Sequence, residues 1–108
     1  MGVLLVLLSV TPVLLAQDAT AEERKVIYAT QVTWAAAATQ EKVYSPAWKT
    51  KPSWVIVASK DGMINPELER FKAKLIKATT LELTSSHVPM ISQPEKVTDF
   101  IISAARKL

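Results

Sequence analysis

The chain has 108 residues, 49% of them hydrophobic and 21% charged, which fits one globular domain and excludes a disordered tail. It has no cysteine and one histidine, which excludes disulfides, cysteine nucleophiles and sites built from several cysteines or histidines, so we predict no metal and no cofactor. Two glycines are too few for a nucleotide-binding glycine loop, and the net charge of +3 is too scattered for a nucleic-acid surface.

Residues 1–17 carry no charged side chain. Their apolar run, 3–16, is shorter than the ~20 residues of a membrane-spanning helix, so we predict no membrane span. It is either a secretory leader, with the small-x-small sequence Ala19-Thr20-Ala21 as its cleavage site, or an apolar strand or helix of a domain whose start has been lost or altered. A leader requires a basic residue before its apolar run, and this run has none. The second interpretation is therefore favoured, and with it a cytoplasmic protein. We therefore divide the chain into an N-terminal segment, 1–17, and a domain part, 18–108.

The domain part opens with a helix signal. Thr20 and Glu23 have the spacing of a capping box, and we expect a helix from Ala21 to Trp34 or on through the alanine run 35–38. Residues 39–52 contain two prolines and mixed polar residues, which predicts a connecting loop.

A strand–helix–strand unit follows. Residues 53–59, which are apolar from Trp54 to Ala58, predict a strand buried on both faces of a parallel sheet. Asn65 and Pro66 predict a helix start after the turn at 60–62. Residues 79–84 alternate polar and apolar side chains, which predicts a half-covered strand parallel to the first. The helix between the strands places four apolar residues on one face: Leu68, Phe71, Leu75 and Ile76.

The last segment predicts a second capping box and a closing helix. The box runs from Ser92 to Glu95. The helix then places one apolar side toward the core, made of Val97, Phe100, Ile101, Ala104, Ala105 and Leu108. We assign the three tryptophans to the core as well: Trp34, Trp48 and Trp54. The fold class is α/β.

Two polar residues follow the two predicted strands. Asp61 lies two residues beyond the first strand and His87 three beyond the second, 26 residues apart. Parallel strands lie about 4.8 Å apart and end at the same edge of a sheet, where ligands bind. We therefore expect Asp61 and His87 within hydrogen-bond reach, as an aspartate that orients a general-base histidine. The alternative is that Asp61 belongs to an ordinary Asp-Gly turn and His87 is an ordinary loop histidine.

The same segments resemble a known family. Residues 51–66, with D-x-x-I-x-P from Asp61 to Pro66, are similar to the acid-bearing strand and turn of α/β-hydrolases. The likeness is to the small bacterial branch related to plant methylesterases and hydroxynitrile lyases. Residues 85–95, with S-H-x-x-M-x-S-x-P, resemble the histidine loop of that branch, and residues 21–31 are similar to the region between its cap and its acid strand. The resemblance covers about 17–108 and implies that Asp61 is the triad acid and His87 the triad base.

The family's nucleophile has no counterpart in this sequence. The serine of a G-x-S-x-G elbow and the oxyanion-hole loop lie upstream in the family, and no serine here lies between nearby glycines. The resemblance thus implies the C-terminal βαβα part of an incomplete hydrolase domain, inactive alone, whose completed form acts on a small ester or amide.

Two strands and their helices leave apolar surface uncovered. We therefore expect exposed apolar side chains, and self-association or a complementing fragment as partner. The alternative function is a non-catalytic interaction or dimerisation module derived from the hydrolase fold.

Overall fold

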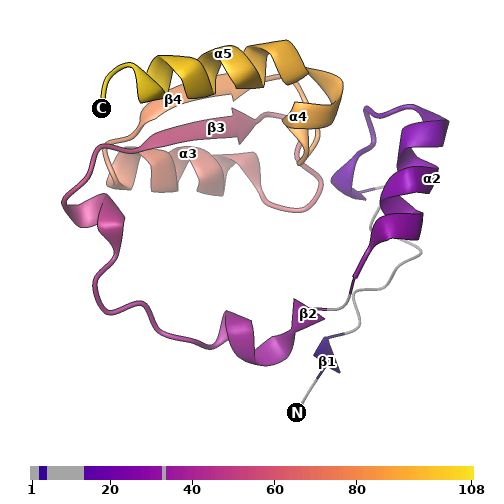
Figure 1. Cartoon of the computed structure of the whole chain (residues 1–108), viewed down its shortest axis with the longest axis horizontal. Helices are drawn as coiled ribbons and strands as arrows, with labels where there is room; N and C mark the ends of the chain where they lie inside the picture. Colours follow the sequence, from indigo (N-terminus) through magenta and orange to yellow (C-terminus); the bar gives the residue numbers. More distant parts are fainter. Residues whose placement is uncertain (1–2, 5–13, 33) are drawn as a thin grey trace.

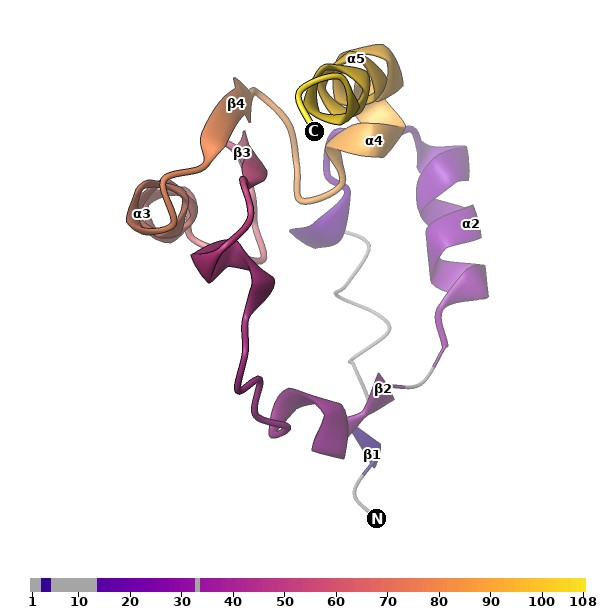
Figure 2. The same ribbon diagram turned by 60° about the vertical axis from the view of Figure 1, so that its left-hand side comes forward.

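The computed structural model describes residues 3–4, 14–32 and 34–108. Two strands form a parallel sheet: β3 (Trp54–Ala58) and β4 (Thr79–Leu83) pair in register from Trp54 opposite Thr79 to Ala58 opposite Leu83. The helix α3 (Pro66–Leu75) connects the strands and lies on one side of them, and α5 (Pro94–Ala105) lies on the other (Figures 1 and 2). The predicted α/β class and the parallel strand–helix–strand unit are therefore confirmed.

The first turn of α3 forms as its sequence predicts. The Asn65 side chain accepts a hydrogen bond from the Glu67 amide at 2.9 Å, and Pro66 occupies the first helical position. At the other end of the helix, Lys77 adopts a left-handed conformation with φ of 55°, and the Ala78 amide donates to the Ala73 carbonyl at 2.9 Å. Helices commonly end with a residue in this conformation, but the conformation costs a non-glycine residue free energy.

The N-terminal half of the domain part departs from the prediction after its first helix. The capping box forms, with Thr20 as N-cap and Glu23 bonded back to it, and starts α2 (Ala21–Thr30). The expected continuation to Trp34 or 35–38 is wrong. The backbone is extended at Gln31, and the Thr30 hydroxyl donates to the Val26 carbonyl at 2.8 Å, a bond that competes with the helix ladder.

The segment after α2 forms short elements instead of a long helix. The strand β2 (Trp34–Ala35) pairs antiparallel with β1 (Val3–Leu4), away from the β3–β4 sheet (Figure 1). Two 3₁₀ turns follow, at Ala36–Thr39 and Ala47–Lys49. The second lies inside the connecting loop that we expected over 39–52.

The predicted capping box at Ser92 is also wrong. Ser92 ends a short helix, α4 (Pro89–Ser92), and its buried hydroxyl has no hydrogen-bond partner among the described residues. The neighbouring Gln93 is the N-cap residue of α5, but its side chain makes no capping hydrogen bond. Its amide donates to the Thr84 carbonyl at 2.9 Å, and its oxygen accepts from Lys96 at 2.8 Å.

The core is small. Its buried apolar members in the described part of the chain are Ala16, Ala19, Val57, Ala58, Ala73, Leu83 and Val97. Only the last two residues of β3 are fully buried, so the expectation that this strand is buried along its whole length is wrong. The core assignment of Trp48 is wrong too, because 45% of it is exposed, whereas Trp54 is half-buried. The side chain of Trp34 lies outside what the structure describes.

The apolar faces of two helices are open to solvent, as expected. Phe71 and Leu75 of α3 are 61% and 62% exposed, and Ile101 of α5 is 61% exposed, so the predicted inward side of α5 holds only for Val97 and in part for Phe100 and Ala104. The accessible surface is 8167 Å², against about 6,000 Å² for a compact protein of this mass. The radius of gyration is 15.6 Å, against about 13 Å for a compact chain of this length.

None of the helices in the described residues is long and apolar enough to cross a membrane.

Candidate active site

Asp61 is held by the turn that follows β3. Its amide donates to the Ala58 carbonyl at 3.1 Å, which closes the turn at the strand end. Its carboxylate oxygen Oδ1 accepts two backbone bonds, from Met63 at 2.7 Å and from Ile64 at 2.9 Å. These bonds fix the orientation of the Asp61 side chain, which has no exposed surface.

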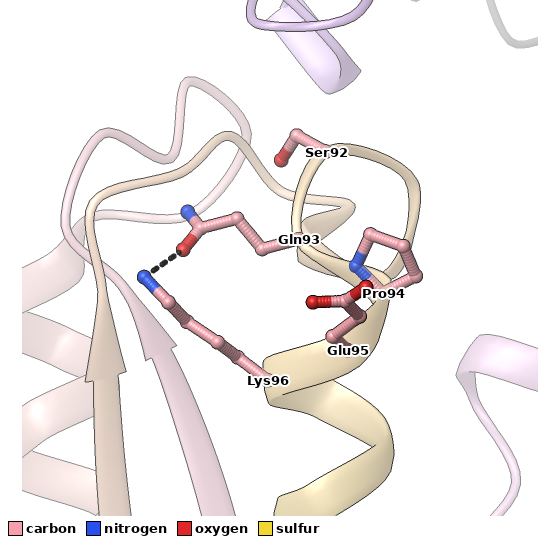
Figure 3. A pocket seen from close by; sticks show the side chains of 5 residues that line it. All are labelled: Ser92, Gln93, Pro94, Glu95 and Lys96. Atoms are coloured by element: carbon pink, nitrogen blue, oxygen red, sulfur yellow. Dashed lines mark hydrogen bonds between the residues drawn. The ribbon is translucent and has the colours of Figure 1, made fainter.

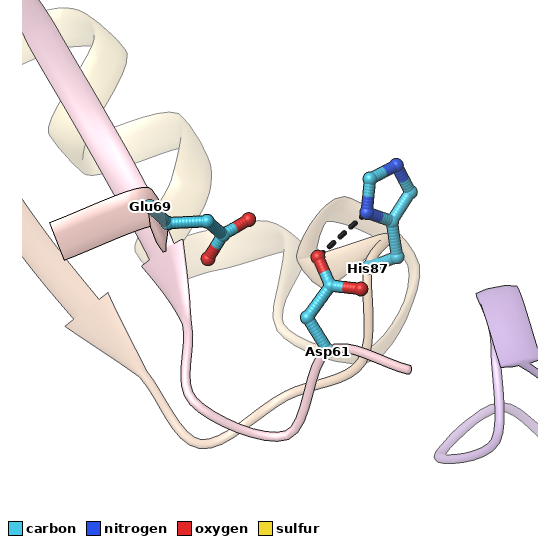
Figure 4. A group of neighbouring side chains, drawn as sticks. All are labelled: Asp61, Glu69 and His87. Atoms are coloured by element: carbon cyan, nitrogen blue, oxygen red, sulfur yellow. Dashed lines mark hydrogen bonds and ion pairs between the residues drawn. The ribbon is translucent and has the colours of Figure 1, made fainter. Parts of the chain in front are cut away.

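His87 leaves the neighbouring strand at the same edge of the sheet. The Lys60 amide donates to the Ser85 carbonyl at 3.1 Å, which joins the loops after β3 and β4. In consequence His87 Nδ1 lies 2.6 Å from Asp61 Oδ2 (Figure 4). The predicted proximity of Asp61 and His87 is confirmed. The His87 side chain is 32% exposed, so the pair lies at the surface with its aspartate covered.

The charge of Asp61 sets the roles in this hydrogen bond. Burial raises the pKa of Asp61, but hydrogen bonds from Ile64, His87 and Met63 outweigh it and hold the pKa below the ordinary value of 3.8. An ionised carboxylate only accepts hydrogen bonds, so Nδ1 carries the proton and donates it. Nε2 of a neutral His87 then has the free electron pair and is the atom that can accept a proton.

Glu69 is a third ionisable group at this site, which the sequence analysis did not single out. It lies one turn into α3, and its Oε2 accepts from the Ala58 amide at the end of β3 at 3.1 Å. Its carboxylate faces Asp61 and His87, and one ligating atom from each of the three residues lies within 4.8 Å of the others (Figure 4). Burial raises the pKa of Glu69 above its ordinary value of 4.5, and the nearby Asp61 carboxylate raises it further.

Two carboxylates and an imidazole at this spacing also raise the question of a metal ion. An ion bound to both Nδ1 of His87 and Oδ2 of Asp61 would replace the 2.6 Å hydrogen bond between these atoms. The bond has the length of a charge-assisted hydrogen bond, and it leaves Nε2 for chemistry. The geometry therefore fits an acid–base group.

A segment before α2 covers the same edge. The Asp18 carboxylate accepts from the Ser86 amide at 3.0 Å, and the Gln17 side chain donates to the Lys60 carbonyl. Burial raises the pKa of Asp18, but hydrogen bonds from Ser86 outweigh it and lower the pKa. Gly62 lies so close to this segment that a Cβ atom on it would be 2.9 Å from the Leu14 carbonyl oxygen. These contacts join residues more than 40 positions apart, so no local pattern in the sequence signals them.

The linings of two surface hollows do not include Asp61 or His87. One, of about 330 Å³, is lined by residues 92–96 at the start of α5, where Lys96 reaches Gln93 (Figure 3). The other, of about 390 Å³, lies between α2 and α4 and is mostly apolar; its lining residues are Glu22, Glu23, Val26, Ile27 and Ile91.

Comparisons of the chain with protein-family models, with curated proteins and with solved structures found no match.

Proposed function

We propose that Asp61 and His87 are the orienting acid and the general base of a hydrolase of the α/β-hydrolase type, which acts on a small ester or amide. The observation that carries the proposal is the 2.6 Å bond between His87 Nδ1 and Asp61 Oδ2, at the carboxyl edge of two parallel strands. Ligand sites of open parallel sheets lie at this edge. The motifs around both residues, which resemble those of the hydrolase family, add to this support.

In the proposed reaction, His87 Nε2 takes the proton of an attacking hydroxyl as that oxygen bonds to the substrate's carbonyl carbon. The imidazolium that forms is stabilised by the ionised Asp61. It then gives the proton to the leaving oxygen or nitrogen as the carbonyl is restored, and the same pair activates water to release the acyl group.

The attacking hydroxyl in this proposal is a serine outside the present residues, since the sequence contains no G-x-S-x-G elbow. The partner is thus a complementing segment that carries the nucleophile and the oxyanion-hole donors. Without them the chain has little of the family's rate enhancement, because loss of a triad nucleophile costs on the order of 10⁶ in kcat in a well-studied protease.

The basicity of Nε2 can be tested on the chain as it is. An activated ester such as p-nitrophenyl acetate acylates a free imidazole nitrogen and releases nitrophenolate. We expect a fast component of this reaction that disappears in His87→Ala, since His87 is the sole histidine. Asp61→Asn should reduce the component to near the level of His87→Ala, whereas Asp99→Asn, which changes an exposed aspartate on α5, should leave it unchanged. Equal rates for the wild type and His87→Ala would refute the proposal.

A non-catalytic interaction or dimerisation module is the second candidate. It is favoured by the open apolar faces of α3 and α5 and by an accessible surface about 2,000 Å² larger than that of a compact chain. Stable interfaces bury about 800 Å² on each partner, so the excess surface on one chain is large enough for an interface. Sedimentation of the wild type and of Phe71→Ser would separate the candidates. A dimer that Phe71→Ser dissociates, together with no ester reactivity at His87, would favour the module.

We propose a cytoplasmic location, with export through residues 1–21 as the alternative. Cleavage after Ala21 would remove Asp18, which holds the Ser86 amide beside His87. The mass of the mature N-terminus decides between them: a chain that retains Asp18 supports the first.

A further inference from the structure

We propose that Glu69 is a positioning residue of this site, whose carboxyl group shares a proton with the Asp61 carboxylate and so keeps Asp61 ionised and directed at His87. The inference rests on the proposed roles of Asp61 and His87. It adds a third member, on a different element, to the pair.

The hydrogen bonds of Asp61 leave one acceptor position of its carboxylate for a further donor. An ionised carboxylate has about four acceptor positions. Three are used, by the amides of Met63 and Ile64 and by His87 Nδ1. Because the Asp61 side chain has no exposed surface, the fourth position faces protein atoms. Glu69 is the ionisable group that approaches it, with an upper limit of 4.8 Å.

Glu69 is itself held at the end of β3. Its Oε2 accepts from the Ala58 amide at 3.1 Å, which fixes the carboxyl group against the end of β3. The other oxygen, Oε1, has no hydrogen bond to the described residues and can therefore carry a proton. A protonated Glu69 thus accepts with one oxygen and donates with the other, and it ties α3 to the turn that carries Asp61.

Few compensating charges surround Glu69. The ionisable groups that act on it are Asp61, which opposes its ionisation, and His87, which favours ionisation only when the imidazole is charged. The next residue of the helix, Arg70, is bonded to Glu82 on β4 and to Glu67. It therefore gives Glu69 no counter-ion. Two carboxyl groups at this distance, with no cation beside Glu69 to balance their negative charges, take up one proton more readily than either group would alone.

Glutamine is the informative replacement at position 69. Its amide oxygen can accept from the Ala58 amide and its amide nitrogen can donate to Asp61, as a protonated glutamic acid does. Leucine has a similar volume but can do neither. The pair of variants therefore separates the proposed donation from a role in packing.

The readout is the carboxyl carbon of Asp61, followed by carbon NMR of the full chain during an acid titration. The chain has three aspartates, so the Asp61 signal is assigned by its loss in Asp61→Asn. We expect Glu69→Gln to leave the titration midpoint of Asp61 within about 0.3 pH of the wild type. Glu69→Leu should raise that midpoint by about 1, as expected for a lost hydrogen bond to a charged group. In the wild type, the Glu69 carboxyl carbon should titrate above pH 4.5, the ordinary value for glutamate.

An unchanged or lower Asp61 midpoint in Glu69→Leu would overturn the inference, and so would equal rises in both variants. If Glu69→Leu does not fold, a midpoint in Glu69→Gln that differs from the wild type is sufficient to overturn it. Failure of the proposed function is seen separately, as ester reactivity that does not depend on His87, because that assay does not involve Glu69.

Discussion

Replacing Asp61 with asparagine changes one oxygen to an amide nitrogen at the point of contact with His87. The oxygen Oδ1 can still accept from the Met63 and Ile64 amides, so the turn keeps its backbone bonds. The new amide nitrogen can only donate, and it faces Nδ1 of His87, which lies 2.6 Å from Asp61 Oδ2 in the wild type. We therefore expect the imidazole to change tautomer, with its proton on Nε2 and its free electron pair on Nδ1.

The cost of this substitution follows from the bond that it removes. Hydrogen bonds to charged groups contribute about 1.5–3 kcal/mol to stability. His87 is 32% exposed, so water takes over part of the interaction, and we expect a loss of about 1.5 kcal/mol in the free energy of unfolding in urea. The chemical effect is larger. With Nε2 protonated, reaction with an activated ester should fall to near the level of His87→Ala; the same change costs about 10⁴ in kcat in a serine protease.

Nitrogen NMR of the single imidazole reports its tautomer directly, and ester reactivity gives the consequence. The wild type should show a protonated Nδ1 and a bare Nε2, and Asp61→Asn the reverse. Asp99→Asn, which removes an exposed aspartate on α5, is the matched control and should change neither. A bare Nε2 in Asp61→Asn, or a rate within a factor of two of the wild type, would refute the reasoning.

Three further outcomes are expected. The free energy of unfolding in urea should be greatest near pH 4–5. Below pH 3.8 it falls because Asp61 and Asp18, whose folded pKa values are lowered, take up protons. Above pH 4.5 it falls because Glu69, whose folded pKa is raised, loses its proton. Glu69→Gln should abolish the decline above 4.5, and a decline that persists would contradict this assignment. Gly62→Ala should destabilise the chain by about 1–3 kcal/mol, since its Cβ atom would lie 2.9 Å from the Leu14 carbonyl oxygen; unchanged melting would show that this contact is absent in solution. Lys77→Gly should stabilise the chain by about 0.5–1 kcal/mol, because glycine adopts a φ of 55° without steric strain. The measurement is a thermal melt, in which the variant should have the higher midpoint.

The sequence was sufficient where local chemistry decides the structure. The apolar run of β3, the Asn65-Pro66 start of α3 and the alternation in β4 each act within a few residues, and all three elements form as predicted. The proximity of Asp61 and His87 followed from topology, because parallel neighbouring strands end at the same edge. Their catalytic roles stay a prediction.

The sequence was insufficient where distant contacts compete with local patterns. Ser92 and Glu95 have the spacing of a capping box, but the Gln93 side chain bonds to the Thr84 carbonyl, and Ser92 ends α4 instead. In the sequence, Glu69 is one of several acidic residues in the first turns of a helix, and nothing distinguishes it. Its contact with Ala58 depends on how α3 lies against β3. The same holds for Asp18, which meets Ser86 across 68 positions of sequence.

The claim that Asp61 and His87 serve a serine nucleophile is tested most directly by the sequence of the DNA that precedes the Met1 codon, translated in all three forward frames. The claim predicts a G-x-S-x-G motif between a predicted strand and a predicted helix in one of these frames. Its absence from all three would contradict the hydrolase assignment and leave the interaction module as the better description of this chain.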